Sequence, residues 1–272
     1  MVAGEGLARD TVAVVLAGGK GTRRGPLARD ECNSALPLGG AYQSIDFALS
    51  NCVNSHIRRI GIVTQSNAES LLHHVNKVWS RIDRRTGDFV EVWPAETRAP
   101  VVAYRGTADA VFRNLELLER QQKGLVLVLD GDHFYEMDYR PMLEFHRRRQ
   151  ADVTIGCIEV PATEARRFGS VSADWRGRVE RFVEETKAPD DLSDGGRVMA
   201  SMGIYVFETP FLARVLLRDA FSHQSQHDFD GDIFPSLVGE SKLFACPFVG
   251  PDGYESAYWR DAGTPMLTQC HA

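Results

Sequence analysis

A glycine-rich segment near the start of the 272-residue chain combines residue types that could bind phosphate. The apolar run Val12–Ala17 leads directly into the sequence Gly-Gly-Lys-Gly-Thr-Arg. Gly18, Gly19 and Gly21 allow a backbone turn whose N–H groups point at an anion, and Arg23 adds a fixed positive charge. The spacing matches neither G-x-G-x-x-G nor G-x-x-x-x-G-K-S/T. We therefore predict a phosphate-binding loop after a buried strand, with an ordinary tight turn as the alternative.

A second candidate site is a pair of carboxylates, Asp130 and Asp132, which directly follows the apolar run Leu125–Leu129. Open α/β sheets bind their ligands at the carboxyl ends of their parallel strands. Oxygen ligands there suit Mg²⁺, which bridges one or two carboxylates to substrate phosphates. A later carboxylate, Asp261, ends an aromatic stretch and is a candidate second ligand. Alternatively, Asp261 caps the helix that follows it, and the pair Asp130 and Asp132 belongs to a solvent-exposed acidic turn.

A third candidate site lies where Gly106 and Thr107, preceded by Arg105, stand before a helix-type pattern that extends to Leu118. The N–H groups of a helix N-terminus attract anions, so this segment could contact a phosphate or a base. The alternative is an ordinary helix start in which Thr107 or Asp109 serves as the N-cap.

The composition bears on the remaining function classes. A net charge of −6 argues against a nucleic-acid partner. The N-terminus lacks the apolar stretch of a signal peptide, and no apolar run reaches the roughly 20 residues of a membrane span, so we expect a cytoplasmic protein without a membrane partner. Five cysteines without a C-x-x-C pair indicate neither a disulfide framework nor a zinc site. His223, His227 and Asp228 stand in a polar loop, and we do not expect them to bind metal.

The elements that would position these residues predict an α/β fold. In the first half, strand-type and helix-type patterns alternate, which favours a doubly wound parallel sheet. The second half contains a hairpin over 171–183 and further strands, which favours an antiparallel extension that walls off a substrate pocket. Strands are expected at 12–17, 57–64, 125–129, 152–160, 200–207 and 243–248, and helices at 45–53, 71–79 and 107–118.

Eight sequence blocks between about Val12 and Thr264 resemble, in order, the catalytic domain of bacterial glucose-1-phosphate adenylyltransferases. The blocks are GGKGTR, IDFALSNCVNSHIRRIGIVTQ, YRGTADAV, GDHFY, FVEE, ASMGIYVF, HDF and YWRDAGT. The resemblance implies Mg²⁺-dependent synthesis of ADP-glucose and pyrophosphate from ATP and glucose 1-phosphate, in glycogen biosynthesis.

The resemblance also implies a Rossmann-like nucleotidyltransferase domain, with a mixed, mostly parallel sheet and helices on both faces, followed by a β-helix. Since the chain ends at Ala272, we expect a single domain over 1–272 without that C-terminal β-helix domain. Its nucleotide-binding half would cover about 10–150, and its sugar-phosphate-binding half about 151–264.

Individual site residues follow from the resemblance. It implies that Arg23 and Asp132 are catalytic and that Asp132 and Asp261 bind Mg²⁺. The implied nucleotide-binding residues are Leu16, Gly18, Gly19, Gly21, Thr22, Tyr104, Arg105, Gly106, Thr107 and Asp109. The implied sugar-phosphate-binding residues are Gly169, Glu184, Ser201, Tyr205, Asp228, Phe229 and Trp259.

The chain departs from the family pattern at two cationic positions. Asn33 stands where the family has a lysine before Pro-Ala, and Glu185 stands where the family has the lysine that grips the sugar phosphate. Lysine supplies only five of the 31 basic residues, yet neither position became arginine, so these are changes of chemistry. Glu96 and Thr97 also replace the adenine-side glutamines.

From these departures we expect reduced activity. One alternative is a catalytically inactive regulatory subunit that binds a nucleotide or sugar phosphate, in a homo-oligomer or in a hetero-oligomer with an active paralogue. The other is a related transferase for a different nucleotide or sugar 1-phosphate.

Overall fold

The first apolar run of the chain forms the strand β1 (Thr11–Leu16), and all six of its residues are buried. β1 pairs in parallel with β2 (Arg59–Thr64) on one side and with β4 (Leu125–Asp130) on the other. β2 in turn pairs in parallel with β3 (Phe89–Pro94). Because both faces of β1 are covered, the strand has no polar alternation. The buried parallel strand predicted from the sequence is confirmed.

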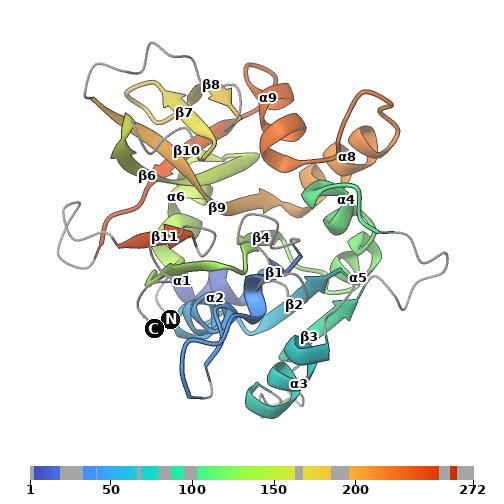
Figure 1. Cartoon of the computed structure of the whole chain (residues 1–272). Helices are drawn as coiled ribbons and strands as arrows, with labels where there is room; N and C mark the ends of the chain where they lie inside the picture. The colour runs from blue at the N-terminus through green and yellow to red at the C-terminus, as the bar shows by residue number, and fades with distance from the viewer. Residues whose placement is uncertain are drawn as a thin grey trace.

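The computed structural model describes residues 3–18, 33–40, 42–65, 69–79, 87–94, 103–162, 168–184, 196–250 and 258–261. In these ranges the strands form one nine-stranded sheet and a separate two-stranded sheet (Figure 1). The main path through the large sheet runs in the order β10-β6-β9-β4-β1-β2-β3.

The second half of the chain extends the sheet with strands of mixed direction. β9 (Arg197–Glu208) runs antiparallel to β4 and to β6 (Val153–Pro161), whereas β10 (Leu243–Pro247) is parallel to β6. β7 (Ser170–Ala173) and β8 (Val179–Val183) form the predicted hairpin, and β7 also pairs with β9. The expected extension of a parallel sheet by antiparallel strands is confirmed.

Helices cover both faces of the large sheet (Figure 1). The helical segments are α1 (Ala3–Arg9), η3 (Asn33–Ala35), α2 (Ile45–Asn54), α3 (Glu69–Val78), α4 (Thr107–Phe112), α5 (Leu115–Glu119), α6 (Arg140–Arg149), α8 (Thr209–Ala220), η8 (Phe229–Ile233) and α9 (Phe234–Leu237). Ala13 and Val15 share an apolar cluster with residues of α2 and α6, whereas Val12 and Val14 share one with residues of α4 and α8. Alternate residues of one strand therefore pack on opposite layers of helices.

The helix predicted from 107 to 118 is wrong in its continuity, because the structure contains two short helices there. The break lies at Asn114, whose backbone N–H bonds to the Val111 carbonyl three residues earlier. The buried Asn114 side chain donates to the Ala110 carbonyl at 2.8 Å and to the Tyr104 hydroxyl at 3.1 Å. A side-chain amide that bonds to nearby backbone competes with helical hydrogen bonding.

The two-stranded sheet joins distant parts of the chain. β5 (His133–Tyr135) pairs antiparallel with β11 (Trp259–Asp261), so that Asp261 lies opposite His133. This pairing carries the end of the described chain to the carboxyl end of β4.

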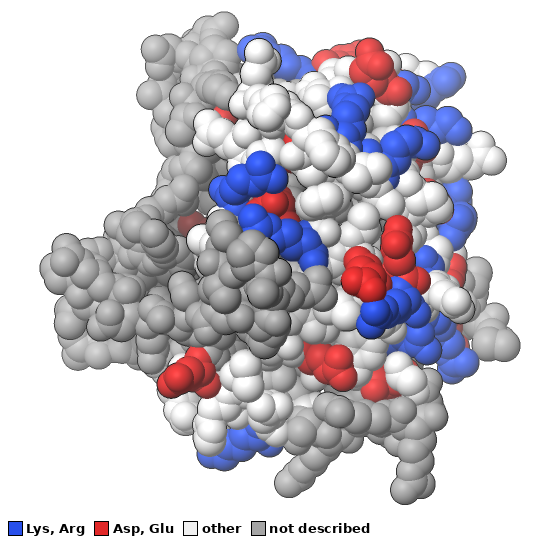
Figure 2. Space-filling view, turned by 90° about the vertical axis from the view of Figure 1, so that its right-hand side faces the viewer, with Lys and Arg blue, Asp and Glu red and all other residues white. Residues whose placement is uncertain are grey.

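The described surface carries charges of both signs. On the face in Figure 2, basic and acidic side chains are interspersed. In the parts of the chain that the structure describes, no helix has the length and apolar character needed to cross a membrane. Cys52 and Cys157 are buried, and burial raises the pKa of both thiols.

His146 on α6 makes the stability of the fold depend on pH. The side chain is fully buried, and its Nδ1 lies 2.8 Å from the hydroxyl oxygen of Thr154. Its Nε2 lies 3.6 Å from a carboxylate oxygen of Glu208, beyond hydrogen-bond distance. Burial, assisted by the neighbouring charge of Arg147, lowers the pKa of His146 from 6.5 to about 4.

We expect this histidine to destabilise the protein in mild acid. As the pH falls from 6.5 towards 4, the unfolded chain takes up a proton at His146 that the folded chain excludes, so stability is lost across this window. The loss assigned to this group is about 2–3 kcal/mol. Urea unfolding at several pH values should show that the free energy of unfolding falls less steeply with falling pH in His146→Gln than in the wild type. Identical slopes would contradict the assignment.

Candidate active site

A cavity of about 430 Å³ lies at the carboxyl ends of β1 and β4. Its walls come from both halves of the chain. The described lining residues are Leu16, Gly18, Ser34, Arg105, Gly106, Thr107, Asp130, Asp132, His133, Phe168, Gly169, Glu184, Ser201, Gly203, Gln226, Asp228, Asp230 and Asp261. Parallel α/β sheets bind ligands at this edge, so the cavity is the candidate active site.

Asp132, His133 and Asp261 form a cluster that could hold a metal ion. One ligand atom from each residue lies within 4.8 Å of the other two. Nδ1 of His133 donates to the Met202 carbonyl oxygen at 3.0 Å, so Nε2 is the ring atom that could face a cation. Nε2 lies 3.7 Å from Asp132 Oδ1. Two carboxylates and an imidazole are a donor set that fits a divalent cation.

The sequence had paired Asp132 with Asp261, and the β5–β11 pairing places these two residues together. His133 was not among the predicted ligands. Its position directly after Asp132 was the available signal, but the direction of its ring depends on the Met202 carbonyl of β9, which no local pattern encodes.

Asp130, the first carboxylate of the predicted pair, lines the cavity but does not belong to this cluster. Burial raises the pKa of Asp130 well above its usual range, and Asp132 and Asp230 raise it further. The side chain fits because Gly203 of β9 has no Cβ; a Cβ there would lie 2.0 Å from Asp130 Oδ2. Gly203 also has a φ of +68°, a conformation that costs other residues free energy.

We expect Gly203→Ala to lower the free energy of unfolding by about 2–3 kcal/mol, from the left-handed backbone and the overpacking against Asp130. Urea unfolding measures this loss. Gly196→Ala is the matched control, because a Cβ at Gly196 would meet no atom within 4 Å. Equal stability of the two variants would show that the space at Gly203 is unimportant.

The side of the cavity where the sequence predicts nucleotide binding is formed by the end of β1 and the start of α4. Leu16, Gly18, Arg105, Gly106 and Thr107 line both the main cavity and an adjoining one of about 170 Å³, which Tyr104 also lines.

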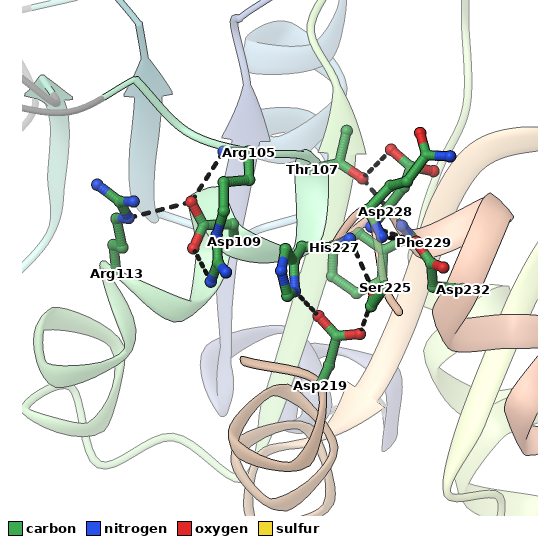
Figure 3. Close-up of polar contacts among 11 residues, drawn as sticks. Arg105, Thr107, Asp109, Arg113, Asp219, Ser225, His227, Asp228, Phe229 and Asp232 are labelled. Carbon is green, nitrogen blue, oxygen red and sulfur yellow. Dashed lines mark hydrogen bonds and ion pairs between the residues drawn. The ribbon is translucent and has the colours of Figure 1, made fainter. Parts of the chain in front are cut away.

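Asp109, also predicted here, lies behind the wall with a side chain that is 1% exposed. It accepts a hydrogen bond from the Arg105 backbone N–H and pairs with the guanidinium groups of Arg105 and Arg113 (Figure 3). Asp109 therefore fixes the position of Arg105.

The alternative that Thr107 or Asp109 caps α4 is wrong. The N-cap position is Gly106, and no side chain caps the helix. A Cβ on Gly106 would lie 2.3 Å from the His227 carbonyl oxygen, so glycine allows a close approach of two backbone segments. The Thr107 hydroxyl instead donates to Asp228 at 2.9 Å.

The residues predicted to bind the sugar phosphate divide into those that line the cavity and those that lie behind its wall. Gly169, Glu184, Ser201 and Asp228 line it, as do Phe168 and Asp230, which were not predicted. The other predicted residues on this side are buried behind the wall: Tyr205, Phe229 and Trp259.

These buried aromatic residues support the wall. Tyr205 donates its hydroxyl proton to Asp230 Oδ1 at 2.8 Å, and burial raises the pKa of this hydroxyl, so it stays protonated. Phe229 packs against the Tyr205 ring. Trp259 makes edge contacts with His133 and Phe168, both of which line the cavity.

Negative charge dominates the described wall. Six carboxylates line it, whereas Arg105 is the only lysine or arginine among the lining residues that the structure describes. A wall of this kind can accept hydrogen bonds from hydroxyl groups and attract cations, but phosphate groups would need further positive charge.

Several predicted site residues lie outside the described residues: Gly19, Gly21, Thr22, Arg23, Glu96, Thr97 and Glu185. For Asn33, the structure gives the backbone, which belongs to η3.

His223, His227 and Asp228 do not form a metal cluster in the structure. Nδ1 of His227 lies 2.8 Å from Asp219, and the Asp228 carboxylate accepts hydrogen bonds from Thr107 and from backbone N–H groups. Among the residues described, the one metal-type cluster is that of Asp132, His133 and Asp261.

The chain was also compared with known proteins. The family described as Nucleotidyl transferase matches residues 12–267.

Three similar curated proteins are each named glucose-1-phosphate adenylyltransferase. The protein from Hydrogenovibrio crunogenus is 47% identical over 259 residues, which cover 95% of this chain and 61% of that protein. The protein from Thiobacillus denitrificans is 46% identical, with coverages of 94% and 59%. The protein from Rhodopirellula baltica is 45% identical, with coverages of 94% and 58%. The chain spans about three-fifths of the length of these curated relatives.

Proposed function

Because the chain belongs to the nucleotidyl transferase family, we propose that it transfers a nucleotidyl group from ATP to glucose 1-phosphate. The products would be ADP-glucose, a glucosyl donor for glycogen biosynthesis in the cytoplasm, and pyrophosphate. The observation that carries the proposal is the Asp132–His133–Asp261 cluster, which lies in one cavity with the end of β1 and the start of α4.

The reaction needs alignment and charge compensation more than covalent help from the protein. An oxygen of the sugar phosphate would attack the α-phosphorus and form a new P–O bond. The bond from the α-phosphorus to the oxygen that bridges it to the β-phosphorus would break, and pyrophosphate would leave with that electron pair. Asp132 and Asp261 would hold Mg²⁺, which when bound would offset negative charge on the triphosphate.

The remaining wall residues have roles that follow from their chemistry. Arg105, held in place by Asp109, would supply a positive charge on the nucleotide side. Glu184, Ser201 and Asp228 would accept hydrogen bonds from sugar hydroxyl groups. Since the described wall is otherwise acidic, the phosphates would depend on Mg²⁺ and on Arg23, the cation that the family resemblance assigns to the glycine-rich loop.

We also propose that the chain is less active than relatives that have a lysine at both of the positions that correspond to Asn33 and Glu185. Asn33 removes a positive charge, and Glu185 replaces one with a negative charge that repels the sugar phosphate. These two replacements also favour one alternative, a subunit that binds substrates without turnover and acts in a complex with an active paralogue.

The test is a pyrophosphate-release assay with glucose 1-phosphate and Mg²⁺ against ATP, CTP, GTP and UTP in turn. We expect release that requires the sugar phosphate and is fastest with ATP. A preference for another nucleotide would overturn the substrate assignment and point to Glu96 and Thr97. No release with any nucleotide, together with calorimetric binding of ATP, would favour the non-catalytic subunit.

A further inference from the structure

Residues 225–228, the last part of the segment between α8 and η8, lie against the start of α4 (Figure 3). The His227 carbonyl oxygen accepts hydrogen bonds from the backbone N–H groups of Ala108 at 2.9 Å and Asp109 at 3.3 Å. These N–H groups belong to the first turn of α4, where backbone N–H groups have no hydrogen-bond acceptor within the helix. One backbone carbonyl therefore joins the sugar side of the cavity to the nucleotide side.

The backbone at His227 has an uncommon conformation for a residue with a side chain. Its φ is +61°, in the left-handed region. Such a conformation costs free energy and persists only where the surroundings hold it. The His227 carbonyl oxygen lies so close to Gly106 that a Cβ would not fit on that residue. Because the two backbone segments approach so closely, a change in the direction of the carbonyl would break its contact with α4.

The His227 side chain supplies the anchor. It is buried, and Nδ1 donates to Asp219 Oδ2 at 2.8 Å. Asp219 lies in the last turn of α8, and its other oxygen accepts a hydrogen bond from the Ser225 hydroxyl at 2.6 Å. The Ser225 hydroxyl oxygen in turn accepts from the His227 backbone N–H at 2.8 Å. The side chain and the backbone of His227 are thus tied to the same carboxylate.

The residue after this anchor reaches the cavity. Asp228 Oδ2 accepts from the Thr107 hydroxyl, and Oδ1 accepts from the backbone N–H groups of Asp230 and Gly231. The Thr107 hydroxyl oxygen also accepts from the Phe229 N–H at 3.0 Å. Thr107 and the start of η8 therefore hold the Asp228 carboxylate, one residue after the left-handed turn at His227.

We propose that His227 is a positioning residue, held by Asp219, that sets both the Asp228 carboxylate and the start of α4 with Arg105. The effect on substrates rests on the proposed function. His227 does not reach the main cavity itself, and it acts through the residues on either side of its turn.

Three substitutions separate the parts of this role. His227→Ala removes the contact with Asp219 and disfavours the left-handed backbone. His227→Gly removes the contact but permits the backbone. His227→Asn keeps a donor at the position of Nδ1, and asparagine tolerates the left-handed region. His223→Ala is the matched control, because His223 is an exposed histidine of the same segment and does not line the main cavity.

The first readout is hydrogen exchange at the N–H groups of Ala108 and Asp109, which requires no substrate. The second is the Kd of ATP with Mg²⁺ and of glucose 1-phosphate, measured by calorimetry. We expect His227→Ala and His227→Gly to speed the exchange and to raise both Kd values about tenfold or more, as for the loss of a hydrogen bond to a charged group. His227→Asn should stay within about threefold of the wild type, and His223→Ala should match it.

Unchanged exchange in His227→Gly would overturn the proposal. So would His227→Asn behaving like His227→Ala, because the donor would then have no role. If His227→Ala fails to fold, the comparison of His227→Gly with His227→Asn still decides. If the wild type binds neither substrate, the proposed function fails, while the exchange measurement still decides whether His227 holds α4.

Discussion

Asp132→Asn and Asp261→Asn should each lower the rate of pyrophosphate release by about 10²–10³-fold, the usual loss for one group that offsets charge in a transition state. Each substitution keeps the shape of the side chain and removes one negative charge from the cluster with His133. The Mg²⁺ concentration needed for half-maximal rate should rise as well, because a neutral amide is a weaker ligand for a hard cation.

The measurement is a Mg²⁺ titration of the initial rate for each variant. Glu240→Gln is the control, since Glu240 is exposed and does not line the cavity. The same titration in the Asn33→Lys, Glu185→Lys background keeps the loss measurable if the wild-type rate is low. An unchanged Mg²⁺ dependence in both aspartate variants would remove this cluster from the metal site.

The double substitution Asn33→Lys, Glu185→Lys should raise turnover by about 10²-fold or more, because a single preorganised charge contact of this kind contributes about 2.7–4 kcal/mol. Glu185→Lys alone should mainly lower the KM for glucose 1-phosphate, since it replaces repulsion of the phosphate with attraction. Asn33→Lys alone should mainly raise kcat, on the expectation that its charge acts in the transition state.

The control for this gain makes the same two residue changes elsewhere. Asn54→Lys with Glu180→Lys alters net charge equally at two exposed positions. It should leave the rate unchanged. Equal rates in the wild type and in the double variant Asn33→Lys, Glu185→Lys would mean that other cations already fill both roles.

The parallel strands could be predicted because burial on both faces leaves a continuous apolar run, as in β1 and β4. The carboxylates at the carboxyl end of β4 could be placed at the cavity for the same reason. In contrast, the end of α4 depends on the Asn114 side chain, which binds the Ala110 carbonyl and the Tyr104 hydroxyl. Propensity and apolar spacing carry no signal for that contact.

Residues that were missed owe their positions to contacts between distant segments. Asp230 belongs to a polar stretch that reads as a turn, and it becomes part of the wall through the Tyr205 hydroxyl of β9. His133 owes its direction to the Met202 carbonyl. The sequence indicated no role for His227, whereas its ring binds Asp219 in the structure. Long-range pairing of this kind leaves no periodic pattern.

We propose that this chain joins a nucleotide to a sugar 1-phosphate at the Asp132–Asp261 cluster. The most direct measurement is mass-spectrometric detection of ADP-glucose after incubation of the protein with ATP, glucose 1-phosphate and Mg²⁺. We predict that ADP-glucose forms slowly with the wild type and faster with Asn33→Lys, Glu185→Lys, and that a chelator or Asp132→Asn suppresses it in both. No ADP-glucose from either protein, or formation that Asp132→Asn leaves unchanged, would contradict the claim.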